Sequence, residues 1–176
     1  MPDQQHHQRQ LCAIVFTDIV GFTKTMEEDE SYAMELLDVQ RKIINLVIEG
    51  HDGQLLKEIG DGTLLMFTSA IDALECALEI QNTVEQDGRF QLRIAIHLGD
   101  VMFEKGDVFG SGVNIASRIE PLASPGGICV SADIWNQVKN QKHISGESLG
   151  EKNLKGVAQP LEIFKINVGE QTVKSS

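Results

Sequence analysis

The chain has 176 residues, of which 41% are hydrophobic, a size typical of one domain with a full core. Its 26 acidic and 15 basic side chains give a formal net charge of -11, which argues against broad binding to nucleic acid or anionic lipid. No apolar stretch approaches the roughly 18 residues that span a bilayer, and the start of the chain is not signal-like. We therefore expect no nucleic acid partner and no membrane insertion.

The three cysteines lie far apart in apolar surroundings, at Cys12, Cys76 and Cys129. They lack the close spacing of a metal or redox motif. We expect buried thiols in a reducing compartment, and hence a cytoplasmic protein.

Hydrophobic periodicity and turn residues predict the elements in chain order. The expected elements are a strand at 11–17, a helix at 29–48, hairpin strands at 54–59 and 63–67, a helix at 70–84, a strand at 92–97 with a hairpin partner at 100–103, a helix at 113–120, a strand at 127–130, a helix at 132–138 and a strand at 161–166. This order predicts an α+β fold, with helices packed on a mostly antiparallel sheet. We expect one domain over 11–168, a disordered N-terminal tail at 1–10 and a C-terminal tail at 169–176.

Two carboxylates interrupt or end apolar strands. Asp18 follows the run at 11–17, and Asp61 stands in the turn Gly60-Asp61-Gly62. If the two strands are neighbours, these side chains converge and can hold a pair of divalent cations. For either residue alone, an ordinary turn or cap is the simpler interpretation.

Asn114 and Arg118 lie four residues apart and therefore on one face of the expected helix. An amide beside a guanidinium can orient a ribose and neutralise charge on a phosphate. Lys155 adds a cation beside a glycine. Taken singly, each of these residues is better explained as a solvated surface side chain.

Four segments resemble, in order and spacing, the catalytic domain of class III adenylyl and guanylyl cyclases. They are FTDIVGFT at 16–23, KEIGDG at 57–62, GDVFGSGVNIASR at 106–118 and LKG at 154–156. The resemblance covers about residues 11–166, and four motifs in the family's order make a chance match improbable. It implies the family's fold, with a ferredoxin-like βαββαβ core.

The resemblance implies that Asp18 and Asp61 bind two Mg²⁺ or Mn²⁺ ions, with the backbone carbonyl of Ile19 completing one site. It also implies that the segment after Ile19 holds the triphosphate through its backbone amides. That segment consists of Val20, Gly21, Phe22 and Thr23.

The same resemblance assigns the purine-reading pair to Lys57 and Asp107. A lysine donor toward N1 and a carboxylate acceptor for the exocyclic amine select adenine, whereas guanylyl cyclases usually carry Glu and Cys or Ser. Asn114 matches the ribose-orienting asparagine, Arg118 the transition-state arginine and Lys155 the lysine on the terminal phosphates. The implied activity is conversion of ATP to 3′,5′-cyclic AMP and diphosphate.

In this family one chain supplies the metal aspartates and its partner supplies the base-reading and transition-state residues. Because this chain carries both sets, the resemblance implies a homodimer with two composite sites, regulated by a fused or separate sensor domain. The alternatives are a guanylyl or mixed-specificity cyclase and a catalytically silent nucleotide-binding domain. A receiver-type phospho-acceptor is disfavoured, because that fold needs a parallel sheet.

One segment departs from the family pattern. Between Gly99 and Asp107 the chain is shorter than in the mammalian enzymes. A shorter segment can shift Asp107 away from the place that base recognition needs, and a surface aspartate in a turn is the alternative interpretation. Glu58 cannot join Lys57 in reading the base, because consecutive strand residues point to opposite faces. His97 and Trp135 are expected to be structural rather than catalytic.

Overall fold

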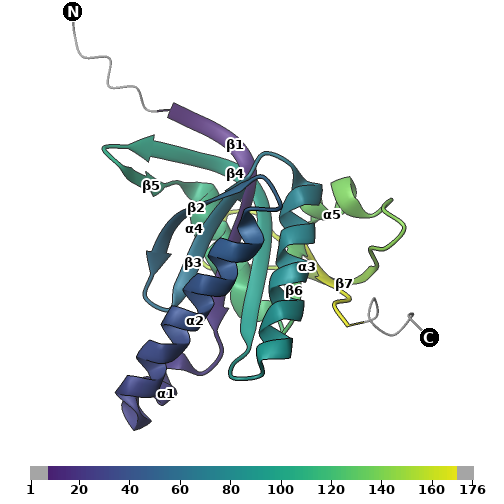
Figure 1. Cartoon of the computed structure of the whole chain (residues 1–176). Helices are drawn as coiled ribbons and strands as arrows, with labels where there is room; N and C mark the ends of the chain where they lie inside the picture. The colour runs from purple at the N-terminus through teal and green to yellow at the C-terminus, as the bar shows by residue number, and fades with distance from the viewer. Residues whose placement is uncertain (1–7, 170–176) are drawn as a thin grey trace, which may run out of the picture.

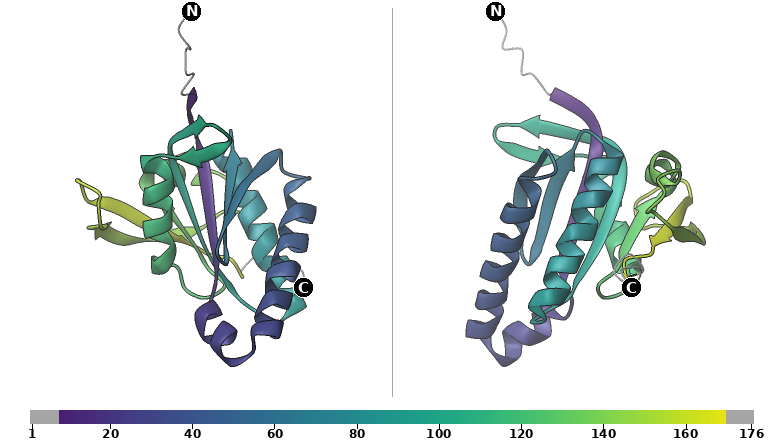
Figure 2. Two further views of the ribbon diagram at one scale, coloured as in Figure 1. Left: turned by 90° about the vertical axis from the view of Figure 1, so that its left-hand side faces the viewer. Right: turned by 45° about the vertical axis from the view of Figure 1, so that its right-hand side comes forward.

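The computed structural model describes residues 8–169, so parts of both expected tails, 1–7 and 170–176, lie outside the described residues. Helices pack on both faces of one eight-stranded sheet. Figures 1 and 2 show α2 and α3 side by side on one face, with α4 on the other. This arrangement confirms the expected α+β class.

The chain alternates strands and helices in the order that the sequence predicts, with three additions. The elements are β1 (Gln8–Ile19), α1 (Phe22–Glu28), α2 (Glu30–Ile48), β2 (Gly53–Ile59), β3 (Gly62–Phe67), α3 (Ala70–Asp87), β4 (Leu92–Glu104), β5 (Asp107–Phe109), α4 (Ser111–Ile119), the 3-10 turn η1 (Glu120–Leu122), β6 (Ile128–Ser131), α5 (Ala132–Val138), β7 (Gly146–Lys152) and β8 (Leu161–Ile166). Helix α1, the short strand β5 and strand β7 were not expected from the sequence.

The strand order is β2-β3-β1-β4-β6-β8-β7, with β5 paired to β4. Every pairing is antiparallel except that of β4 with β6. β1 lies between β3 and β4 and its core residues are fully buried, which explains its continuous apolar run.

Two expectations about the strands are wrong. β1 begins at Gln8, so residues 8–10 belong to a strand rather than to a tail. The expected turn at Gly99 does not form, because β4 pairs with β1 without interruption from Leu92 to Phe103. The hairpin partner of β4 is instead β5, after a turn at 105–106.

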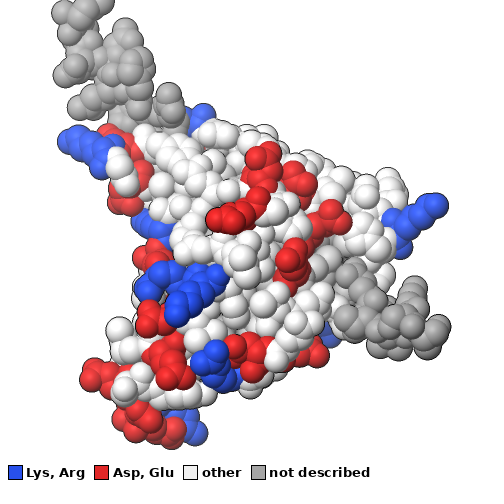
Figure 3. All heavy atoms as spheres, in the orientation of Figure 1, with Lys and Arg blue, Asp and Glu red and all other residues white. Residues whose placement is uncertain are grey.

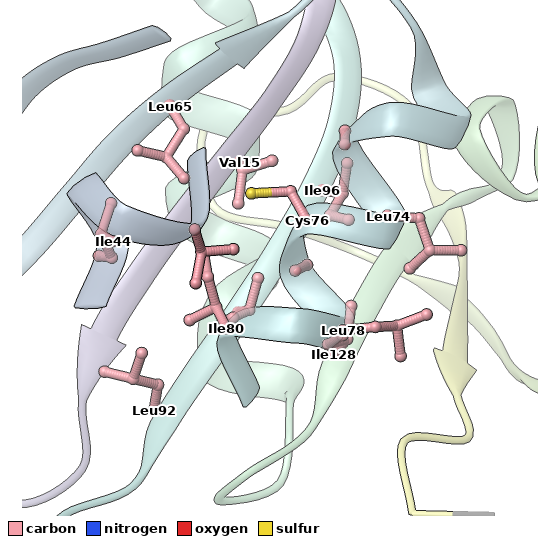
Figure 4. Packing of buried hydrophobic residues seen from close by; sticks show 14 of the residues in the cluster. Val15, Ile44, Leu65, Leu74, Cys76, Leu78, Ile80, Leu92, Ile96 and Ile128 are labelled. Atoms are coloured by element: carbon pink, nitrogen blue, oxygen red, sulfur yellow. The ribbon is translucent and has the colours of Figure 1, made fainter. Parts of the chain in front are cut away.

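The main core lies between the sheet and the pair α2 and α3 (Figure 4). A second cluster, under α4, includes Cys12, Ile14 and Leu64. Residues of β1 therefore alternate: Ala13 and Val15 face α2 and α3, whereas Cys12 and Ile14 face α4. This alternation decides which face receives each polar residue at the end of the strand.

The cysteines are buried as expected, and His97 and Trp135 have structural contacts. Cys12, Cys76 and Cys129 are buried free thiols. His97 is buried, its Nδ1 lies 2.9 Å from Ser131 Oγ, and burial lowers its pKa to about 4. The ring of Trp135 stacks on Phe164 with 5.0 Å between the centroids.

Candidate active site

Asp18 lies one residue before the end of β1 and belongs to the even-numbered residues that face α4. Its neighbours Thr17 and Ile19 face the other way and are buried. Since successive strand residues alternate between faces, the Asp18 side chain lies on the face opposite to those of Thr17 and Ile19. The carboxylate is half-buried, close to the turn that follows β1.

Asp61 is brought beside β1 by the tight hairpin of β2 and β3. Gly60 opens the two-residue turn with a φ of 61°, a value that favours glycine. A Cβ on Gly62 would lie 2.8 Å from the carbonyl oxygen of Thr17, so only glycine lets the hairpin approach β1 this closely. The N–H of Ile19 donates to Asp61 Oδ2 at 2.9 Å.

The structure therefore brings together the two aspartates expected to hold metal, and it adds a third carboxylate. Burial, contact with Asp61 and the charge of Glu120 together raise the pKa of Asp18 to about 8. Burial also raises the pKa of Glu120, which faces Arg93 across the same site. The sequence analysis missed Glu120 and Arg93, because Glu120 stands at a helix end and only the pairing of β1 with β4 puts Arg93 opposite Asp18.

This carboxylate set fits a divalent cation with oxygen ligands. The raised pKa of Asp18 reflects negative charges crowded in a desolvated place, a condition that a bound cation relieves. Within residues 8–169 no group of three or more His, Cys, Asp or Glu side chains has the geometry of a complete metal site. Backbone carbonyls, water and substrate phosphates would have to complete the shell, as is usual for Mg²⁺.

The segment after Ile19 turns directly into α1. Gly21 has a φ of 70° and precedes the first helical residue, Phe22. The Val20 N–H donates to the Gln91 carbonyl at 2.9 Å, whereas the first N–H groups of a helix have no intrahelical partner. Backbone donors at Phe22 and Thr23 thus lie next to the aspartates, where an anion held by the metal ions could accept from them.

Lys57 and Asp107 form an ion pair with 2.9 Å between Nζ and Oδ1. This contact holds the pKa of Asp107 below its usual range. Asp107 also borders a hollow of ≈ 290 Å³ between β2 and the β4–β5 hairpin. The short segment before Asp107 has not carried it away from Lys57.

A β-bulge in β2 puts Lys57 on the α4 face. Leu55 lies opposite Leu65, but Lys57, not Leu56, lies opposite Leu64. Without the extra residue, Lys57 would share the face of Leu55 and point toward α2. Glu58 does point that way and pairs with Arg41 of α2 at 2.9 Å, as expected for the residue next to Lys57.

Asn114 and Arg118 are exposed on α4, whose opposite side is buried against the sheet. Among residues 8–169, neither side chain forms a hydrogen bond or ion pair with a group of the same chain. Both point away from the sheet, although Glu120, two residues after Arg118, contacts Asp18. Both side chains are therefore open to a second molecule.

Lys155 is exposed in the turn between β7 and β8, next to Gly156 with a φ of 80°. The left view of Figure 2 shows this strand pair extending away from the body on the side of α4. The structure does not bring Lys155 to the aspartates of the same chain.

No helix among the described residues is long and apolar enough to cross a membrane. On the face shown in Figure 3, Lys and Arg side chains over α2 lie among Asp and Glu side chains. That face offers no extended basic surface, in keeping with the excess of acidic residues.

The model of the adenylate and guanylate cyclase catalytic domain matches residues 4–168. A Rhizobium meliloti protein that carries the name of an adenylate cyclase is 36% identical over 165 residues, which are 89% of this chain and 28% of that protein. An adenylate cyclase of Streptomyces coelicolor is 34% identical over 130 residues, 73% of this chain and 34% of that protein. The chain thus spans about a third of the length of these relatives.

A crystal structure described as an adenylate/guanylate cyclase/hydrolase from Silicibacter pomeroyi superposes with a TM-score of 0.83 and 34% identity. The match covers 91% of this chain and 98% of that one. The adenylyl cyclase CyaB of P. aeruginosa, 22% identical with a TM-score of 0.81, shares the fold over 92% of this chain and 96% of its own. The chain belongs to the family of adenylate and guanylate cyclase catalytic domains.

Proposed function

We propose that the chain converts ATP to 3′,5′-cyclic AMP and diphosphate at two composite sites of a homodimer. The observation that carries this proposal is the convergence of Asp18 and Asp61 at the C-terminal end of β1. The names of the relatives support an adenylate cyclase, and the Lys57–Asp107 pair supports adenine rather than guanine as the base.

Asp18, Asp61 and the Ile19 carbonyl would hold two Mg²⁺ or Mn²⁺ ions. When bound, these ions would lower the pKa of the ribose 3′-hydroxyl and neutralise the charge of the triphosphate. The backbone amides of Gly21, Phe22 and Thr23 would bind the phosphates, whereas the Val20 N–H, expected to join them, is already paired with the Gln91 carbonyl. Lys155 of the partner subunit would contact the terminal phosphate.

The remaining groups would come from the partner subunit, an arrangement supported by the exposure of Asn114 and Arg118. In this arrangement Lys57 donates to N1 of adenine and Asp107 accepts from the exocyclic amine. Asn114 orients the ribose so that its 3′-oxygen faces the α-phosphorus in line. Arg118 stabilises the charge that develops on the α-phosphoryl oxygens.

The matched region is about a third of the length of these relatives. We propose that a sensor domain, fused or separate, regulates this catalytic domain.

The test is incubation of the purified chain with ATP and Mn²⁺, followed by measurement of cyclic AMP, with a parallel reaction on GTP. We expect cyclic AMP, and a lower rate with GTP. Production of cyclic GMP alone would assign a guanylyl cyclase. Binding of nucleotide without any cyclic product would assign a silent regulatory domain.

A further inference from the structure

A buried hydrogen-bonded network lies directly behind the two proposed metal aspartates. Its members are Gln40 on α2, Thr17 on β1 and Thr63 on β3, with exposed fractions of 2%, 0% and 2%. None of the three has a part in the proposed mechanism. Buried polar groups are costly unless they are paired, so this network requires an explanation.

Gln40 is polar on an otherwise apolar face. The other buried residues of α2 are Ala33, Leu36, Ile43, Ile44, Val47 and Ile48. Figure 1 shows α2 lying over the part of the sheet formed by β2 and β3. A leucine at this position would fit the apolar face of α2 equally well. The hydrogen bonds of the amide, not its burial, therefore explain the glutamine.

Both polar atoms of the Gln40 amide form hydrogen bonds. Nε2 donates to the backbone carbonyl of Asp61 at 3.1 Å, and Oε1 accepts from Thr17 Oγ1 at 3.4 Å. The two threonine hydroxyls lie 2.6 Å apart. Because the Thr17 proton goes to Gln40, Thr63 must donate to Thr17.

Asp61 is therefore held at two points. The Ile19 N–H holds its carboxylate at 2.9 Å, and Gln40 holds its main-chain carbonyl from the opposite side of the sheet. The first contact would remain if the turn shifted with β1, but the second ties the turn to α2. A glycine precedes and follows Asp61, so the turn has little stiffness of its own.

We propose that Gln40 is a positioning residue of the metal centre: its amide fixes the Asp61 turn from behind, so that the carboxylate meets Asp18 with the spacing that the cations need. This inference rests on the proposed function of Asp18 and Asp61. It makes α2 a structural support of the catalytic site without contact to substrate.

Gln81 offers a matched control. It is a second buried glutamine, on α3, with 3% of its surface exposed. Its Nε2 donates to the carbonyls of Leu92 and Gly127 and not to the Asp61 turn. Gln40→Met and Gln81→Met each replace a buried amide by an apolar side chain of similar size, so a general loss of stability affects both.

The experiment measures Mn²⁺ binding by electron paramagnetic resonance, with 3′-deoxy-ATP as an unreactive nucleotide, together with cyclase activity and the melting temperature. We expect Gln40→Met to raise the Mn²⁺ dissociation constant at least about tenfold and to raise the metal requirement for activity by a similar factor. Gln81→Met should change the Mn²⁺ dissociation constant less than twofold. Arg41→Gln, which removes an exposed contact of the next α2 residue with the same hairpin, should behave like Gln81→Met.

The inference is overturned if Gln40→Met lowers the melting temperature as Gln81→Met does but binds Mn²⁺ as the unaltered chain does. Equal weakening of Mn²⁺ binding in both variants would also overturn it, because the cause would then be general destabilisation. If the unaltered chain neither binds Mn²⁺ nor makes a cyclic nucleotide, the proposed function fails, a result distinct from these.

Discussion

At the scale of single residues, burial and neighbouring charge raise the pKa of a carboxyl group at the proposed metal site, which contains Asp18, Asp61 and Glu120. A carboxyl group whose pKa is raised to about 8 holds a proton at neutral pH unless a cation replaces it. Glu120 is 6% exposed and has Arg93 as its positive neighbour. Metal binding at this site is therefore expected to release protons.

The pH dependence of stability tests this charge crowding. The pKa of Asp18 rises from 3.8 in the unfolded chain to about 8 in the fold, so the folded state holds an extra proton between these values. The stability that this group contributes is complete below about pH 4 and is lost as the pH rises through about 8. In EDTA, the melting temperature of Asp18→Asn should therefore exceed that of the unaltered chain increasingly from pH 4 to 8.

Adding Mn²⁺ should reduce this difference, because the cation stabilises the ionised carboxylate that asparagine lacks. Thermal melts at a series of pH values give both comparisons. Parallel curves for the two proteins across the range would contradict the assigned pKa.

Arg118 is the residue whose role depends most on a partner. Its side chain is exposed and has no partner among residues 8–169, so Arg118→Ala should leave the melting temperature nearly unchanged. Turnover should fall by a factor of roughly 10²–10³, the usual cost of removing one donor to transition-state charge. Arg89→Ala, which removes another exposed arginine, should retain normal turnover in the same cyclic AMP assay. Near-normal turnover of Arg118→Ala would refute its role.

At the scale of elements, the hairpin of β2 and β3 carries two residues of the proposed site. Its turn holds Asp61, and its bulge directs Lys57 toward Asp107 instead of α2. Two adjacent residues of α2 contact this hairpin from behind, Gln40 at the turn and Arg41 at Glu58. Helix α2 thus supports the hairpin along its length.

The Lys57–Asp107 pair predicts base specificity. In the double variant Lys57→Glu/Asp107→Ser, the donor toward N1 of adenine is lost and a guanine-compatible acceptor takes its place. We expect the ratio of GTP to ATP turnover to rise at least about tenfold, since buried polar groups left unpaired by the wrong base are costly. Glu58→Gln alters the adjacent residue on the opposite face and should leave the ratio unchanged. An unchanged ratio in the double variant would remove Lys57 and Asp107 from base recognition.

At the scale of the whole molecule, the residues of the proposed site form two sets that differ in their exposure to solvent. The aspartates lie at the end of β1, whereas Asn114 and Arg118 point outward from α4. In the proposed symmetric dimer, the exposed Asn114 and Arg118 of each chain would lie over the aspartates of the other. The dimer then has two equivalent sites.

Complementation tests this arrangement directly. Asp61→Ala and Arg118→Ala chains should each be nearly inactive alone. Mixed in equal amounts, they should recover roughly a quarter of normal activity, because half of the dimers are mixed and one of their two sites is intact. Activity per chain should also fall on dilution, as the dimer dissociates. No recovery on mixing would show that each site lies within one chain.

The sequence by itself determined the α+β class and the order of most elements, because hydrophobic periodicity reports burial directly. It also determined the family, through four motifs in order. It did not determine the uninterrupted β4, because the pairing of Gly99 with Cys12 of β1 overrides a local turn signal. Polar β7 was missed because its pairing with β8, not its own pattern, makes it a strand.

Only the tertiary structure decided the contacts between distant segments. The bulge before Lys57, the ion pair to Asp107, the placement of Glu120 beside Asp18 and the Gln40 network each join residues far apart in the chain. Spacing along one sequence reports which side of its own element a residue occupies. It does not report which residue of another element lies opposite, because that depends on the register and packing of the whole sheet.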